Sequence, residues 1–418
     1  MLVGLRRKWG PLLAANRKAG LLLLSAVWLV AGFSFATRHA GAGEEPAHDL
    51  FYASFYVFVP SGNTPSVSLI NKSTDEMIGR IVLPMVPRQI VVSEAVHLLA
   101  AIDGTSSRIV LVDLVSGKQR EVDPGFPAQK LWLSGDATLL AAVDLAGGKI
   151  AFVDLVHRRA RSQVSVAGPI RDLLFSADDK NLFFAADGLD GIGVIDVARG
   201  QSLAPIPAFS PGGAIITGLT RSPDGLVSYA VGDGGRAIRF AQPQDWPPGA
   251  IDGRAGAAAT EPAEAGPYLV APIEVATDVG KLFPTGYGKY LVALDNGSGT
   301  VTLAATASAK PVATLHGLAA MSTAYSGWFD AVSIVASATE ARLLVVDLDR
   351  LDVAGAIDLP GVPGSGSVTD DGSKLYVPIG AADAVAVIDL RNRRLSKIIP
   401  VAAAPSAAVM TRSFDICH

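Results

Sequence analysis

Residues 109–118 read Ile-Val-Leu-Val-Asp-Leu-Val-Ser-Gly-Lys, a run of apolar, mostly β-branched residues that ends at an aspartate and a glycine-containing turn. Similar phrases return at positions 149–155, 192–197, 343–348 and 385–390. Their aspartates are Asp113, Asp154, Asp196, Asp347 and Asp389, so neighbouring copies lie 41 or 42 residues apart. A period of about 40 residues with several short strands per unit is typical of a β-propeller.

The unit around this phrase contains four short apolar segments, which we interpret as the strands of one antiparallel blade. The same unit can be laid on residues 128–164, 170–203, 215–274, 279–315, 318–357 and 362–399. The first unit starts at its second strand, with Phe55, and the segment Ser406–Met410 reads as an innermost strand without a sheet. We therefore predict an all-β propeller of four-stranded antiparallel blades, closed by this C-terminal strand. The count favours eight blades; seven is the alternative, because the stretch 232–284 is irregular.

The chain outside the repeated units falls into an N-terminal segment, a leader, an insertion and a C-terminal tail. Residues 1–42 combine a basic start with an apolar run, Leu21–Ala36, and we expect a signal peptide or an N-terminal anchor. Residues 43–54 form a leader, residues 55–410 the propeller and residues 411–418 a C-terminal tail. An Ala-, Pro- and Gly-rich stretch at 242–266 reads as a flexible insertion, with Trp246 more suited to folding back on its blade than to contacting a partner.

This organisation predicts an exported protein, in the periplasm or, alternatively, at the cell surface or anchored to the inner membrane. A single cysteine among 418 residues means that no internal disulfide stabilises the fold. The net charge of −4 argues against nucleic acid as a partner, and we expect membrane contact only through an uncleaved N-terminal segment.

Three passages carry a resemblance to a known family: the turn Ser222-Pro223-Asp224-Gly225, the segment Asp371–Pro378, and the Val-Ile-Asp type of ending at Asp196 and Asp389. They resemble the YVTN-repeat β-propellers, a family of exported, surface-layer-type proteins. The resemblance implies the propeller fold but no particular activity. In its number of blades, the predicted fold also resembles the haem d1-binding propellers of nitrite reductases. This second resemblance would imply a haem-type cofactor.

A second series of aspartates follows the second strand of each unit, in loops that should share one face of the ring. These residues are Asp103, Asp144, Asp187, Asp233, Asp295 and Asp383. The sequence leaves two interpretations of these aspartates open. Aspartate favours turns because it bonds nearby backbone N–H groups, and a ring of carboxylates can also attract a cation, a metal or a basic partner.

We expect three other side chains near the same face. Arg88 and Arg171 start two innermost strands, where they suit either an anionic ligand or the loop carboxylates. His316 lies at a connection between blades. At the chain end, Cys417 and His418 together could ligate copper or zinc. Alternatively, Cys417 could pair with a cysteine of another protein, or the two residues could belong to a frayed tail.

No catalytic constellation is recognisable in the sequence. It contains no His-x-His pair and no second cysteine for a zinc site. We therefore expect a binding or assembly module for a protein partner or small ligand on the acidic face, without a resident cofactor. The alternative is an enzyme, or a redox or cofactor-handling accessory protein that uses a metal ion or a haem-type group, with its site in the channel.

Overall fold

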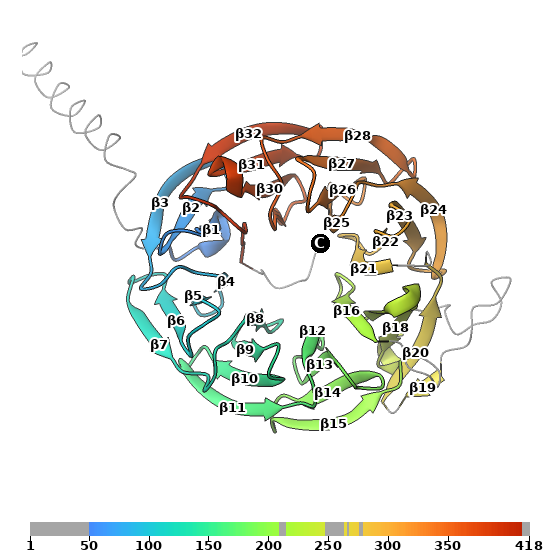
Figure 1. Ribbon diagram of the computed structural model, residues 1–418, viewed down its shortest axis with the longest axis horizontal. Helices are drawn as coiled ribbons and strands as arrows, with labels where there is room; N and C mark the ends of the chain where they lie inside the picture. Colours follow the sequence, from blue (N-terminus) through green and yellow to red (C-terminus); the bar gives the residue numbers. More distant parts are fainter. Residues whose placement is uncertain (1–49, 209–214, 247–262, 266, 276–278, 412–418) are drawn as a thin grey trace, which may run out of the picture.

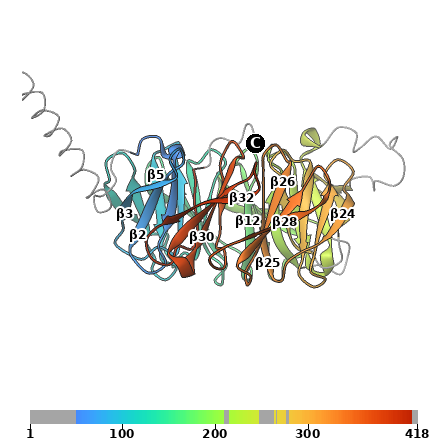
Figure 2. The ribbon, with the colours of Figure 1, turned by 90° about the horizontal axis from the view of Figure 1, so that it is seen from above.

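The computed structural model describes residues 50–208, 215–246, 263–265, 267–275 and 279–411, which form eight sheets arranged as a ring around a central channel (Figure 1). Seen from the side, the ring is a disc (Figure 2). The predicted all-β propeller is confirmed, and the count of eight blades excludes seven.

Each blade is an antiparallel meander in which the strands follow one another from the channel outward. Blade 1 contains β1 (Tyr56–Pro60), β2 (Ser66–Asn71) and β3 (Glu76–Val82). Blade 2 contains β4 (Gln89–Ser93), β5 (Leu98–Ile102), β6 (Ile109–Asp113) and β7 (Gln119–Val122). Blade 3 contains β8 (Lys130–Leu133), β9 (Leu139–Asp144), β10 (Lys149–Asp154) and β11 (Arg159–Ser165). Blade 4 contains β12 (Ile170–Phe175), β13 (Asn181–Ala186), β14 (Ile192–Asp196) and β15 (Gln201–Ile206).

The second half of the ring repeats this order. Blade 5 contains β16 (Ile216–Arg221), β17 (Ser228–Gly232), β18 (Ala237–Ala241) and β20 (Tyr268–Ile273), with β19 (Ala263–Ala265) added at its outer edge. Blade 6 contains β21 (Val279–Pro284), β22 (Tyr290–Asp295), β23 (Thr300–Ala305) and β24 (Lys310–His316). Blade 7 contains β25 (Met321–Gly327), β26 (Val332–Ser337), β27 (Arg342–Asp347) and β28 (Asp352–Asp358). Blade 8 contains β29 (Ser367–Val368), β30 (Lys374–Ile379), β31 (Ala384–Asp389) and β32 (Arg394–Pro400).

The apolar phrases occupy the middle strands because both faces of such a strand are covered by neighbouring blades. All five residues of β5 are buried, as are the first four of β6. One cluster joins Leu111 of blade 2 to Leu140 of blade 3, and another joins Leu99 to Leu69 of blade 1. A strand buried on both faces needs a continuous apolar run rather than alternation, which is what the repeated phrase supplies.

The aspartate that ends each phrase caps the turn that follows. Asp113 accepts hydrogen bonds from the N–H groups of Val115 and Ser116, and the other four aspartates bond their own turns in the same way. Two of them also take an arginine from the next blade. Arg158 Nη2 lies 2.6 Å from Asp113 Oδ2, and Arg393 Nη1 lies 2.7 Å from Asp347 Oδ2.

The ring is closed by the C-terminal segment, as the sequence predicts. Val409 forms an antiparallel bridge with Phe58 of β1, with both backbone hydrogen bonds at 2.8 Å, and Pro405 bridges Ser61. The segment thereby becomes the innermost strand of blade 1. Because Ala408 also bonds Ser365 of blade 8, the same segment joins the first blade to the last.

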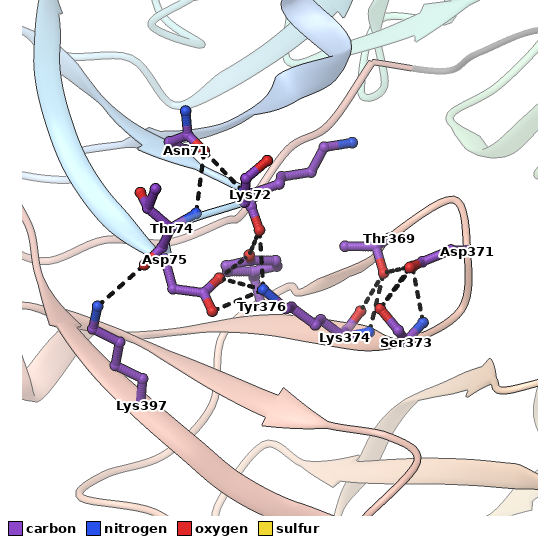
Figure 3. Close-up of polar contacts among 11 residues, drawn as sticks. Asn71, Lys72, Thr74, Asp75, Thr369, Asp371, Ser373, Lys374, Tyr376 and Lys397 are labelled. Carbon is purple, nitrogen blue, oxygen red and sulfur yellow. Dashed lines mark hydrogen bonds and ion pairs between the residues drawn. The ribbon is translucent and has the colours of Figure 1, made fainter.

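A polar network fastens the seam between blades 8 and 1 (Figure 3). Lys374 Nζ lies 2.8 Å from Asp75 Oδ2 and 3.0 Å from the carbonyl oxygen of Lys72, and Tyr376 donates its hydroxyl to Asp75. Burial, followed by the hydrogen bond to the Asp75 carboxylate, raises the pKa of Tyr376 well above its usual value. The tyrosine therefore stays protonated and keeps donating.

Of the predicted insertion in blade 5, residues 242–246 and 263–265 belong to the described part of the chain. After the short helix η3 (Pro243–Asp245), Trp246 is buried beneath Arg239, whose guanidinium lies 5.0 Å from the centre of the indole ring. Trp246 thus folds back onto its blade, and β19 pairs with β20. No helix within the described ranges is long and apolar enough to cross a membrane, and residues 1–49, which include the predicted signal or anchor, lie outside those ranges.

Ending the chain after Pro400 tests the closure. We expect the truncated protein to unfold or aggregate, because the channel-side edge of β1 loses its strand and becomes available to other chains. Size-exclusion chromatography and thermal unfolding measure this. A monomer with the parent's melting temperature would show that the C-terminal strand is dispensable.

Replacing Lys374 by Met tests the seam. The substitution leaves the Asp75 carboxylate partly buried without its ammonium partner, so we expect the free energy of unfolding to fall by about 1–3 kcal/mol. Urea unfolding measures it. Lys180→Met is the matched control, because its ion pair with Asp178 is exposed, and it should change stability by less than about 0.5 kcal/mol; equal effects of the two substitutions would contradict the role of the seam.

Candidate functional site

Five of the six aspartates of the second series accept hydrogen bonds from backbone N–H groups. Three bond their own loops: Asp103 accepts from the N–H groups of Thr105 and Ser106, Asp144 from Gly147, and Asp295 from Ser298. Burial acts to raise the pKa of Asp103, but the bonds from Ser106 and Thr105 outweigh it and the pKa lies below the ordinary value. These hydrogen bonds agree with the turn interpretation.

The other three aspartates connect neighbouring segments. Asp187 pairs with Arg171, which is the carboxylate partner foreseen for this arginine. Asp233 accepts from the N–H of Ile215, and Asp383 accepts from the N–H of Ala404 at 2.7 Å, which ties the closing segment to blade 8. Among the residues that the structure describes, no group of three or more His, Cys, Asp and Glu side chains is arranged to hold a metal ion.

The remaining predicted site residues do not gather at one point. Arg88 is exposed just before β4, and its side chain lies against Gly104 in the loop that contains Asp103. His316 is exposed at the end of β24, the outermost strand of blade 6, so it does not line the channel (Figure 1). Cys417 and His418 lie outside the described residues, and their metal-binding role stays a prediction.

The channel wall is built from one strand of each blade, and side chains join these strands where no backbone ladder does. Gln89 of β4 both donates to the carbonyl of Leu131 and accepts from its N–H, at 3.0 and 2.9 Å. Asp172 of β12 accepts from the N–H of Leu219 on β16 at 2.8 Å. Blades are therefore connected across the channel wall by polar side chains that the periodic pattern does not reveal.

A cavity of about 480 Å³ opens in this wall, between β4 and β8 on one side and blade 8 with the closing segment on the other. Lys130 of β8 is exposed to it and forms no ion pair within the described part of the chain. Trp132, two residues further along the same strand, presents a partly buried indole. Val91, Val368 and Met410 add apolar surface, and the carboxylate of Asp370, which pairs with Lys72 at 3.3 Å, also borders the cavity. The cavity therefore combines a cation without an ion pair with a lining that is apolar in part.

Sequence reasoning missed Lys130 and Trp132. A signal was present, because alternate residues of a strand point to one face, and the positions 130 and 132 on a predicted innermost strand share the face that meets the channel. The chain segments that complete the cavity, near residues 367 and 409, are more than 230 positions away, and no local pattern pairs them with β8.

A haem-type group can be tested against these residues. Its carboxylates would suit Lys130 and its macrocycle would suit the apolar lining. However, none of the described histidines reaches the cavity: His97 stacks on Phe51, His157 pairs with Asp154, and His316 is peripheral. The described residues therefore do not fit a haem held by histidine ligation of its iron.

Asp172 is a carboxyl group on the channel wall whose pKa is raised above its ordinary value. Burial raises its pKa, against the backbone hydrogen bonds from Leu219 and Leu173 and the charges of Lys130 and Lys281. A cavity of about 230 Å³ lies beside it, lined in part by Lys281 and Tyr229. Because its bonds go to backbone groups, we assign Asp172 to the connection of blades 4 and 5.

Replacing Asp172 by Asn gives a pH-dependent test. The folded state holds the Asp172 proton more tightly than the unfolded chain does, so this group lowers stability as the pH rises above about 4. The asparagine side chain of the variant does not titrate, and it has one acceptor oxygen fewer, which lowers the stability of the variant by the same amount at every pH. We expect the melting temperature of the variant, relative to that of the parent, to rise between pH 4 and pH 7. Parallel pH profiles of the two melting temperatures would show that Asp172 ionises in the folded protein without a loss of stability.

Comparisons with known proteins agree with this architecture. The chain is similar in structure to the dihydro-heme d1 dehydrogenase NirN, solved in complex with DHE, with a TM-score of 0.67 and 16% identity over 87% of this chain and 77% of that one. It is similar to apo AztD from Citrobacter koseri, with a TM-score of 0.60 and 13% identity over 85% of this chain and 96% of that one. A Kuenenia stuttgartiensis hydrazine synthase chain matches with a TM-score of 0.50 and 14% identity, covering 84% and 95%.

Identities this low establish the fold alone. No family model and no curated protein matches the chain. The chain is therefore an eight-bladed β-propeller, and its place among the YVTN-repeat propellers stays a prediction.

Proposed function

We propose that this protein is an exported, non-catalytic binding module that takes an amphiphilic organic anion into its channel cavity. The observation that carries the proposal is Lys130, a cation without an ion pair, next to Trp132 on the wall of a cavity of about 480 Å³. Sites for small molecules are typically concave and apolar, with a few polar groups that set orientation.

The two parts of the cavity have separate roles. Contact with Trp132, Val91 and Val368 removes apolar ligand surface from water, at roughly 25 cal/mol per Å². Lys130 orients the ligand by pairing with its carboxylate or sulfonate, and a hydrogen bond to a charged group is worth about 1.5–3 kcal/mol. An anion therefore gains from both. A cation gains only from the apolar surface, because the carboxylate in the lining, Asp370, already pairs with Lys72.

A second candidate function is the handling of a tetrapyrrole cofactor. NirN was solved with DHE bound, and a tetrapyrrole carries both an apolar macrocycle and carboxylates. In this chain Lys130 would hold the carboxylates, and no described histidine would ligate a metal. The face that contains Asp103 and the other five aspartates of the second series remains our candidate surface for a basic protein partner.

Anilinonaphthalene sulfonate, an anionic probe that fluoresces in apolar sites, tests the proposal on the folded protein. We expect one saturable site, and Lys130→Met should weaken it about tenfold, because the charge-assisted contact is lost. The neutral analogue phenylnaphthylamine should bind parent and variant alike. Lys149→Met, an exposed lysine on the third strand of the same blade, is the matched control.

Two results decide between the outcomes. Equal affinity of the anionic probe for the parent and Lys130→Met would overturn the channel site. Displacement of the probe by metal-free mesoporphyrin at stoichiometric concentration would favour the tetrapyrrole candidate over smaller anions.

A further inference from the structure

The turns between the first and second strands follow one pattern in four blades. A Ser or Thr hydroxyl donates to an Asp two residues later, in the pairs Ser134–Asp136, Ser176–Asp178, Ser222–Asp224 and Thr369–Asp371. In each turn the residue after this aspartate has a positive φ: Ala137, Asp179, Gly225 and Gly372. The repeat thus supplies an internal reference for what this turn needs.

Blades 6 and 7 depart from that reference at the aspartate position. The pairing of Thr285 with Tyr290 matches that of Ser134 with Leu139, which aligns Tyr287 with Asp136. The pair Gly327–Val332 aligns Phe329 in the same way. Both aromatic side chains are more than half exposed, and their rings stack with centroids 5.7 Å apart and planes inclined by 29°.

A buried carboxylate holds the two turns together. Asp330 accepts hydrogen bonds from the Thr285 hydroxyl and the N–H groups of Tyr287 and Lys289, all in the neighbouring blade. Three consecutive residues, Trp328, Phe329 and Asp330, have φ values of 50°, 57° and 56°. Non-glycine residues adopt this conformation at a cost, and such strain clusters where it positions a functional group.

The stacked rings border a cavity of about 230 Å³ whose charged lining residues are acidic: Asp330, Asp370 and Asp371. No Lys or Arg belongs to this lining. On Trp328, which also lines the cavity, the guanidinium of Arg391 lies 5.0 Å from the ring centre. Aromatic faces are electron-rich and attract cations, so rings and carboxylates together favour a positive ligand.

We propose that this aromatic cavity binds a small organic cation of the alkylammonium or quaternary ammonium class. Tyr287 and Phe329 provide the ring faces, and Asp371 provides the negative charge, because Asp370 already pairs with Lys72 at 3.3 Å. The site is distinct from the channel cavity in charge preference, although both reach Val368, Asp370 and Thr411. An anion in one cavity and a cation in the other would lie side by side at one end of the channel.

Choline and its neutral isostere dimethylbutanol, in which carbon replaces the nitrogen, test the proposal by calorimetric titration of the whole protein at fixed ionic strength. We expect choline to bind saturably and the isostere at least tenfold more weakly, because only choline gains from the rings and carboxylates. Equal binding of the two, or no binding of choline at millimolar concentration, would overturn the proposal.

Two substitutions locate the site. Phe329→Asn should abolish choline binding while keeping or raising the melting temperature, because Asn adopts a positive φ more readily than Phe. Phe329→Leu keeps an apolar side chain without a π face and should also lose at least fivefold. Tyr52→Ala, which removes an exposed tyrosine outside the cavity, is the matched control; unchanged affinity in either Phe329 variant would place the cation elsewhere.

Discussion

The structure depends on the pairing between the closing segment and β1. A propeller has no covalent link between its first and last blades, and a chain with one cysteine has no internal disulfide to supply one. Closure therefore rests on the bridges from Val409 to Phe58 and from Pro405 to Ser61, and on the Asp75, Lys374 and Tyr376 network. If they separated, the apolar cluster between blades 8 and 1 would meet water on two faces.

Closure also creates the channel and what it can bind. Each blade contributes its innermost strand to the wall, and the seam places the closing segment opposite β4 and β8. Side chains such as Gln89 and Asp172 form hydrogen bonds that join neighbouring strands of the wall. Lys130, by contrast, forms no ion pair within the described part of the chain. The channel cavity is therefore recognised from the position of Lys130 beside Trp132 and the closing segment, and not from the fold class.

Repetition gives a second way to find a site. A turn that must only reverse the chain is served by Ser or Thr with Asp, as in four blades, since the carboxylate bonds the hydroxyl and nearby N–H groups. Tyr287 and Phe329 give up those bonds, expose large rings and accept backbone strain in blade 7. Reversing the chain direction does not require exposed aromatic rings at these positions, so we attribute the rings to the binding of a ligand.

The sequence by itself determined the class of fold, the capping aspartates such as Asp113 and the closing strand, and it favoured eight blades over seven. These features are local or periodic: a turn, a strand buried on both faces, and a spacing of about 40 residues can be read along the chain. Only the tertiary structure decided that His316 lies at the rim, that Asp172 joins two blades, and that Lys130 meets residues near 367 and 409. The physical reason is that ring closure brings together side chains far apart in sequence, and which polar groups remain unpaired depends on every neighbour that the ring supplies.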